Sequence, residues 1–176
     1  MLKLKSWQLF LIFLIPTAIP FLFPIEKREH GMMIGAIIWA LIYIYWLDNL
    51  GTNLFMRCRK KSKINIQLFK FNTLFIFIYI FVIVALKYLV DKKTDINPGI
   101  LVVIMCALSL YAVIGILAIL SFVCKVLITV EERQLATFDQ YAVEFIFLLF
   151  FPIGIWWLQP RINTIFSRKR IHENLS

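Results

Sequence analysis

The chain has 176 residues, of which 61% are hydrophobic and 16% are charged. Soluble domains are typically about 45–50% apolar and about 25% charged, so a free-standing soluble globule is excluded, and so is a disordered chain. The longest polar stretch, residues 57–70, is too short to form a second, soluble domain. Residues 1–176 therefore predict a single all-α integral membrane domain with short loops.

Nineteen Lys and Arg residues outnumber ten Asp and Glu residues, which gives a formal net charge of +9. In a membrane protein such an excess first indicates orientation, because basic loops stay in the cytoplasm. It can also attract anionic lipids or a polyanionic ligand. The three cysteines, Cys58, Cys106 and Cys124, contain no CxxC pair, so neither a disulfide framework nor a thiol redox enzyme is expected.

The first apolar segment, residues 7–25, is not followed by a small-x-small cleavage site, so we interpret it as an uncleaved first span. Pro16, Pro20 and Pro24 recur every four residues on nearly one helical face, and each removes a backbone hydrogen bond. We expect a kinked anchor helix here. The alternative is a hinge, or a wall that lines a cavity.

Three further spans are expected at residues 31–55, 71–89 and 99–128. The last of them exceeds the ~20 residues needed to cross a bilayer, so it must tilt or project beyond it. Pro98 suits the first position of its helix.

A fifth apolar segment covers residues 138–160 and is interrupted at Pro152 and Gly154. If it turns there and returns, fourteen Lys and Arg residues lie inside and five outside; if it crosses, the split is ten to nine. The positive-inside rule favours the return, although only about six residues of the apolar segment remain for the return leg, which allows a shallow excursion. We therefore expect four spans plus a re-entrant or interfacial segment, with a spanning fifth segment as the alternative. Both termini, including the basic tail 161–176, would then be cytoplasmic.

Residues 151–163 read Phe-Pro-Ile-Gly-Ile-Trp-Trp-Leu-Gln-Pro-Arg-Ile-Asn. This stretch resembles the C-terminal signature of small uncharacterised membrane proteins of Bacteroidota. The resemblance covers thirteen residues and implies a protein of the bacterial inner membrane, with no activity attached to it.

Charged side chains within hydrocarbon are costly, so each one needs a reason. Asp48 lies nine residues before Arg57, or about 13 Å of helix inside the cytoplasmic boundary. Asp48 is part of a polar patch on the second span that also contains Asn49, Thr52 and Asn53. Lys125 lies at a comparable depth on the fourth span. An Asp48–Lys125 pair would join helices within one chain. The alternatives are the lining of a pore or vestibule, or a proton relay.

Glu144 lies one turn into the fifth segment, and its candidate partners are Arg161 and Lys125. We add it to the polar intramembrane patch.

Five positive charges crowd the loop after the second span: Arg57, Arg59, Lys60, Lys61 and Lys63. Such a cluster mainly holds a loop inside. It can also contact anionic lipid or bind a polyanion such as a nucleotide or an oligonucleotide.

Two spans have small residues at helical spacing. Gly31 and Gly35 form a GxxxG pair, and Ala112, Gly115 and Ala118 recur every three residues. Small residues let helix backbones approach closely. These faces predict either packing within the chain or self-association.

The sequence has no HExxH motif, no Cys/His cluster, no phosphate-binding loop and no nucleophile elbow. We therefore expect no enzyme, no metal and no cofactor. The first hypothesis is a homo-oligomeric pore or channel-type protein of the inner membrane, gated through its basic face by an anionic ligand, as in membrane effectors of antiphage defence systems. The alternatives are a non-conducting membrane subunit or scaffold that binds another membrane or cytoplasmic protein, and a small transporter.

Overall fold

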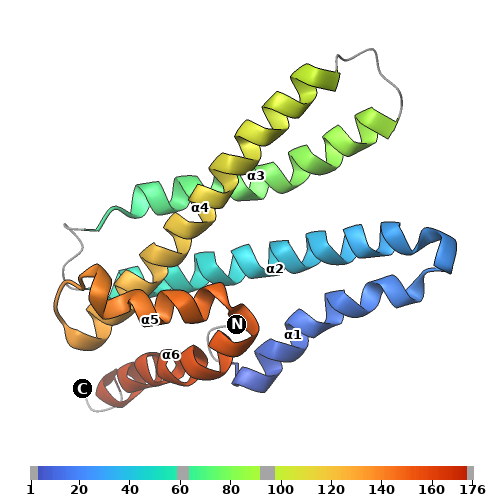
Figure 1. Cartoon of the computed structure of the whole chain (residues 1–176). Helices are drawn as coiled ribbons and strands as arrows, with labels where there is room; N and C mark the ends of the chain where they lie inside the picture. The colour runs from blue at the N-terminus through green and yellow to red at the C-terminus, as the bar shows by residue number, and fades with distance from the viewer. Residues whose placement is uncertain (1–3, 59–63, 92–97, 174–176) are drawn as a thin grey trace. The chain divides into compact units, whose positions relative to one another are not determined.

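A computed structural model describes residues 4–58, 64–91 and 98–173 (Figure 1). Within these ranges every regular element is a helix and no strand occurs, so the all-α prediction is confirmed. In chain order the elements are α1 (Ser6–Ala18), the 3-10 helices η1 (Ile19–Leu22) and η2 (Ile25–Lys27), α2 (Arg28–Arg57), α3 (Ile66–Asp91), α4 (Pro98–Glu132), α5 (Phe138–Leu149) and α6 (Phe151–Glu173).

Three helical stretches are long and apolar enough to cross a membrane: Ile25–Arg57, Ile66–Lys87 and Gly99–Glu132. They indicate a membrane protein, and they correspond to the second, third and fourth predicted spans. The α4 helix begins at Pro98, as its sequence predicts, and continues to Glu132.

The first predicted span is not one continuous helix, because its prolines break it. The α-helix ends at Ala18, and Pro20 has no N–H with which to continue the α-helical ladder. The carbonyl of Pro16 instead accepts a hydrogen bond from the N–H of Ile19. After Pro24 the chain turns into α2, and the apolar helical stretch Ser6–Leu22 stays shorter than the three long ones.

The chain divides into two compact units. Unit 1 comprises Met1–Ile64 and Leu120–Ser176, and unit 2 comprises Asn65–Ile119. In unit 1, α1 and α2 lie side by side and antiparallel, and α5 and α6 form a second helical hairpin that also contacts α1 (Figure 1).

Phe151, the first residue of α6, lies at the centre of an aromatic cluster in unit 1. Its ring centroid is 4.3 Å from that of Phe13, 4.5 Å from that of Tyr43 and 5.4 Å from that of Trp46, in edge-to-face arrangements. Such pairs add to the stabilisation that burial alone provides. This cluster holds the start of α6 against α1 and α2.

In unit 2, α3 and the first part of α4 are joined by polar side chains. The hydroxyls of Tyr79 and Ser109 are 2.7 Å apart, and the Tyr111 hydroxyl donates to Oδ1 of Asn72 at 3.1 Å. Hydrogen bonds of this kind join helices in lipid, where burial of apolar surface gives little driving force.

The fifth apolar segment forms a hairpin whose break lies earlier than predicted. The α5 helix ends at Leu149, the chain turns at Phe150, and α6 continues through Pro160 as far as Glu173. The return helix therefore has 23 residues, far more than the six left within the apolar segment. Periodicity of apolar residues did not indicate this helix, because its second half is polar.

Gly154 makes the corner between α5 and α6 possible. A Cβ atom at this position would lie 1.8 Å from the carbonyl oxygen of Phe147, so only glycine allows this approach of the two backbones. Pro152, the other predicted hinge residue, falls in the first turn of α6, and its side chain is outside the described part of the structure.

Candidate functional site

Three charged side chains of unit 1 meet where α4, α5 and α6 converge. Arg161 of α6 donates from Nη1 to Oε1 of Glu144 on α5 at 2.7 Å, and from Nε to Oε1 of Glu131 on α4 at 3.1 Å. Its Nη2 also contacts Oε2 of Glu131. We call Glu131, Glu144 and Arg161 the Arg161 cluster. One guanidinium thus joins three helices.

The Arg161 cluster carries two carboxylates and one cation, and it is partly removed from water. Glu144 is only 7% exposed, and its Oε2 accepts no hydrogen bond from the residues that the structure describes. The hydrogen bond to Glu131 raises the pKa of Arg161 above its ordinary value; burial opposes this, and the bond to Glu144 adds to it. Arg161 is therefore a permanent cation.

Next to the Arg161 cluster, α6 holds the beginning of the chain. Gln159 is fully buried and donates from Nε2 to the carbonyl of Leu4 at 3.0 Å, and Asn163 donates from Nδ2 to the same carbonyl at 3.1 Å. Gln159 and Asn163 are four residues apart, so they share a face of α6. Through them α6 fixes where α1 starts.

Arg57, the first residue of the predicted basic loop, is engaged inside unit 1. Its Nη1 donates to the carbonyl of Ile165 at 2.6 Å, and its guanidinium lies 4.0 Å from the ring centroid of Phe166. The other four loop residues predicted to bind an anion, Arg59, Lys60, Lys61 and Lys63, lie outside the described residues. A polyanion site on this loop therefore stays a prediction.

The polar patch on α2 turns largely toward its own helix. Nδ2 of Asn49 donates to the carbonyl of Tyr45 at 2.9 Å, and Nδ2 of Asn53 donates to the carbonyl of Asn49 at 2.7 Å. Oγ1 of Thr52 is buried and has no hydrogen-bond partner among the described residues.

Lys125 is half-buried on α4, and it does not form the expected pairs. Both ion pairs between described residues involve Arg161. Neither an Asp48–Lys125 pair nor a Glu144–Lys125 pair is among them. Of the two partners considered for Glu144, it is Arg161 that binds it.

The small-residue faces pack within the chain. A Cβ at Gly35 would lie 2.5 Å from the carbonyl oxygen of Pro16, and one at Gly31 would lie 2.9 Å from Cα of Pro20. Both glycines therefore serve the contact of α2 with α1 and η1. Pro16 and Pro20, the predicted hinge residues, are the partners in this contact.

The small residues of α4 are less tightly enclosed. A Cβ at Gly115 would lie 3.4 Å from Cδ1 of Ile76 on α3, an ordinary contact. Ala112 is buried and Ala118 is half-buried.

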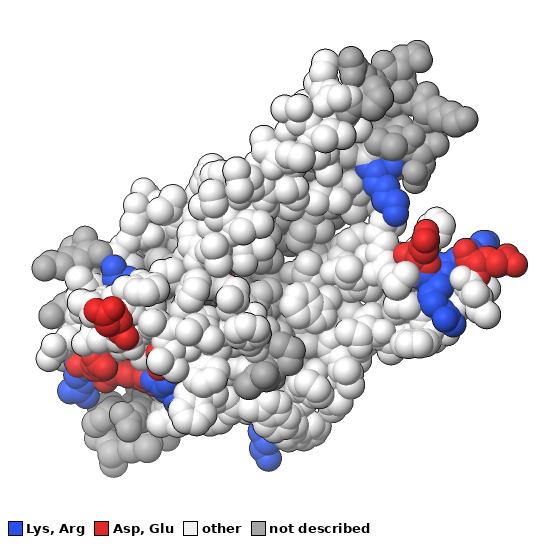
Figure 2. Space-filling view, viewed as in Figure 1, with Lys and Arg blue, Asp and Glu red and all other residues white. Residues whose placement is uncertain are grey.

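The register of α1 against α2 shows which residues share a level. Pro20 faces Gly31 and Pro16 faces Gly35, so four residues along α1 match four residues along α2. Continued along both helices, this register places Lys5 level with Trp46, next to Asp48. Figure 2 shows charged side chains at the η2 end of α2 and around the α4–α5 turn, with a mostly uncharged surface in view between them.

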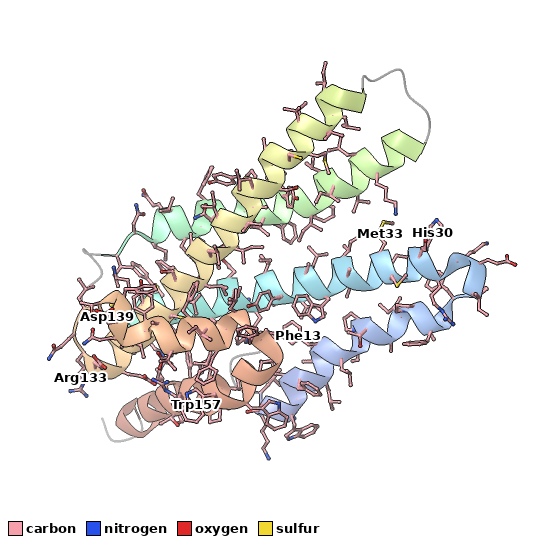
Figure 3. All side chains as sticks on the ribbon, viewed as in Figure 1. Phe13, His30, Met33, Arg133, Asp139 and Trp157 are labelled. Atoms are coloured by element: carbon pink, nitrogen blue, oxygen red, sulfur yellow. The ribbon has the colours of Figure 1, made fainter. Side chains whose placement is uncertain are left out.

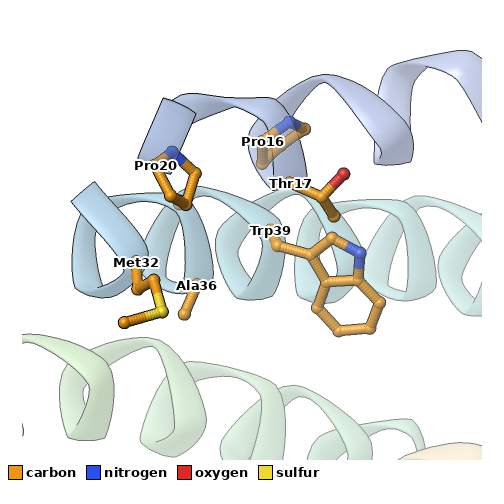
Figure 4. A pocket seen from close by; sticks show the side chains of 7 residues that line it. Pro16, Thr17, Pro20, Met32, Ala36 and Trp39 are labelled. Atoms are coloured by element: carbon orange, nitrogen blue, oxygen red, sulfur yellow. The ribbon is translucent and has the colours of Figure 1, made fainter. Parts of the chain in front are cut away.

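An apolar groove of about 360 Å³ lies between α1–η1 and the first half of α2. Its lining residues are Pro16, Thr17, Pro20, Met32, Gly35, Ala36 and Trp39 (Figure 4). As for metals, the described part of the chain holds no group of three or more His, Cys, Asp or Glu side chains able to bind one.

Sequence reasoning missed most of the residues that organise this region. Glu131 and Asn163 were not singled out, and Arg161 was considered only as a partner of Glu144. Phe151, Gln159, Arg161 and Asn163 all fall within residues 151–163, the first half of α6. Their contacts with α1, α4 and α5 depend on tertiary packing and leave no periodic pattern.

Comparison of the chain with models of protein families, with curated proteins and with solved structures found no match. Its function is therefore inferred from its own geometry.

Proposed function

We propose that the chain is a non-conducting subunit of the bacterial inner membrane, which presents a cytoplasmic helical platform to another protein. The platform consists of α5, α6 and the end of α4. The observation that carries the proposal is the Arg161 cluster, because it joins these three helices by charge-assisted hydrogen bonds. A surface that must hold its shape for a partner benefits from such fixation.

The proposed topology has four crossing helices and a hairpin that enters and leaves on one side. Lys5 and Asp48 lie at nearly the same level, which supports a membrane boundary at that level. The charged stretch from Glu26 to His30 supports the opposite membrane boundary. The apolar part of α2 between them is about 25 Å long at ~1.5 Å per residue, close to the ~30 Å of a bilayer core. By the positive-inside rule the Asp48 side is cytoplasmic.

The depth of the α5–α6 corner supports a shallow insertion. Phe151 contacts Tyr43, five residues before Asp48 and so about 8 Å inside this boundary. The twelve residues of α5 span only about 18 Å, too little to cross. Trp156 and Trp157 are 54% and 57% exposed (Trp157 is labelled in Figure 3), and Trp156 packs against Phe10 of α1. Exposed tryptophans are enriched at membrane interfaces.

Several of the features that would favour a homo-oligomeric pore are engaged within the chain. Gly31 and Gly35 contact α1 and η1, the amides of Asn49 and Asn53 bond to their own helix, and Arg57 is held by α6. These contacts are compatible with a scaffold, whereas a water-filled pore would require some of these groups to face its lumen. This favours the scaffold hypothesis over the pore and the transporter.

Two measurements test the proposal. Liposomes that contain the purified protein should leak ions no faster than protein-free liposomes, and Asp48→Asn should change nothing. In cells, a photo-crosslinker at the exposed Gln140 should give one discrete adduct that Arg161→Met abolishes, while a crosslinker at His30, at the opposite end of α2, should not give it. An ion flux that Asp48→Asn abolishes would overturn the proposal and restore the pore.

A further inference from the structure

The groove between α1–η1 and α2 lies at the end of unit 1 opposite the Arg161 cluster. Pro16 and Pro20 form one wall, and Met32, Ala36 and Trp39 form the other (Figure 4). Ala36 and Met32 are exposed, so the groove is open along its length. From Met32 to Trp39 it extends about 10 Å along α2, starting next to the charged η2 end. Its position suits the hydrocarbon of one leaflet.

Charged residues stand at the mouth of this groove. Arg28 is four residues before Met32 and eight before Ala36, so it lies on the same face of α2 as the groove. Its guanidinium lies 5.8 Å from the ring centroid of Phe21, the neighbour of the lining residue Pro20. Glu29 follows directly and borders the same face.

The charge at the mouth is balanced. Glu26, Lys27, Arg28 and Glu29 sum to a formal charge of zero, and Arg28 and Glu29 are both exposed. Neither Arg28 nor Glu29 forms an ion pair with another residue that the structure describes. Adjacent, unneutralised charges of opposite sign complement a headgroup that itself carries a separated anion and cation.

We infer that the groove binds one phospholipid with a zwitterionic headgroup of the phosphatidylethanolamine class. One acyl chain occupies the groove against Pro16, Ala36 and Trp39. The phosphate accepts hydrogen bonds from Arg28, and the ammonium group lies against Glu29. An acyl chain fits a groove with a mainly apolar lining, in which the hydroxyl of Thr17 already donates its proton to the carbonyl of Leu14. This site is independent of the proposed platform.

The test measures the phospholipid that stays on the protein. The full chain is reconstituted into nanodiscs that contain equal amounts of phosphatidylethanolamine and phosphatidylglycerol. It is then released in a mild detergent, and the mass of the protein with its bound lipid is measured by native mass spectrometry. The wild type should retain one phosphatidylethanolamine per chain. Ala36→Phe, which fills the groove, should lower retention about tenfold. Ala18→Phe is the matched control, because Ala18 is exposed and outside the groove.

Two headgroup variants complete the design. Arg28→Gln should lower retention several-fold through loss of the charged hydrogen bonds, and it decides the question if Ala36→Phe does not fold. Glu29→Gln should reduce the preference over phosphatidylglycerol. Equal retention in Ala36→Phe and Ala18→Phe, or no lipid on the wild type, would overturn the inference. So would a preference for phosphatidylglycerol, or a wild-type dimer that Ala36→Phe dissociates, which would assign the groove to a second copy.

Discussion

The two units hold their helices together by different means. In unit 1, α1 and α2 meet through backbone contacts at Gly31 and Gly35, and charges join α4, α5 and α6. In unit 2, α3 and α4 are joined by hydroxyl and amide side chains, with Gly115 in ordinary contact. Both are known ways to associate helices in lipid.

The difference teaches how to interpret small residues in a membrane sequence. Both glycine-containing faces are conspicuous in the sequence, but only the Gly31–Gly35 face excludes a larger side chain. Spacing reveals that two backbones can approach. It does not reveal whether they do.

The largest expected effect is at the Arg161 cluster of unit 1. Arg161→Met leaves Glu131 and the buried Glu144 without their cation, so we expect a loss of about 3 kcal/mol in the free energy of unfolding. Thermal or SDS unfolding of the detergent-solubilised protein measures it. Arg133→Met removes the same charge from an exposed position and should change stability little. Equal losses in the two variants would show that net charge, and not the cluster, matters.

A matched pair of alanines tests the comparison itself. Gly35→Ala pushes Pro16 away and should lower the free energy of unfolding by about 2 kcal/mol. Gly115→Ala meets only the end of the Ile76 side chain and gains helix propensity, so it should be within about 0.5 kcal/mol of the wild type. The same unfolding assay decides, and a greater loss for Gly115→Ala would reverse our comparison.

A smaller effect is expected for the polar contacts of unit 2. Tyr79→Phe removes the hydroxyl that contacts Ser109, and such bonds in membranes average about 0.6 kcal/mol. The control is Tyr45→Phe, since Tyr45 is exposed. Double substitution with Ser109→Ala should cost no more than the first change alone; additive losses would argue against a direct bond.

The smallest expected effect is a gain in stability, at the turn that follows α4. Arg133 adopts a positive φ of 59°, a conformation that glycine adopts without strain. Arg133→Gly should therefore raise the free energy of unfolding by about 0.5 kcal/mol, in the range known for backbone substitutions. A loss of stability would mean that the Arg133 side chain contributes contacts of its own.

Much of the fold could be predicted, because it depends on local patterns. Long apolar stretches give α2, α3 and α4, and Pro98 begins α4. The prolines predicted a kink in the first span, but not that the α-helix ends at Ala18, and the α5–α6 corner lies at Phe150 and not at the predicted Pro152. Both depend on how a proline or a glycine meets another backbone, which residue spacing does not specify.

The candidate site could be predicted only in part. Glu144 and Arg161 were recognised as charges that needed partners, but the third member of the cluster, Glu131, seemed to be an ordinary residue at a helix end. The contact of Gln159 with Leu4 joins residues 155 positions apart. Only the tertiary packing of the aromatic cluster around Phe151 brings such groups together.

The most direct test of the account is the side of the membrane on which α6 ends. In a background without cysteines, Ser167→Cys, Asn65→Cys and His30→Cys would each be treated in intact cells with a membrane-impermeant maleimide. We predict that His30→Cys is labelled and that Ser167→Cys and Asn65→Cys are protected until the membrane is opened. Labelling of Ser167→Cys together with His30→Cys would contradict it, because the α5–α6 segment would then cross the bilayer.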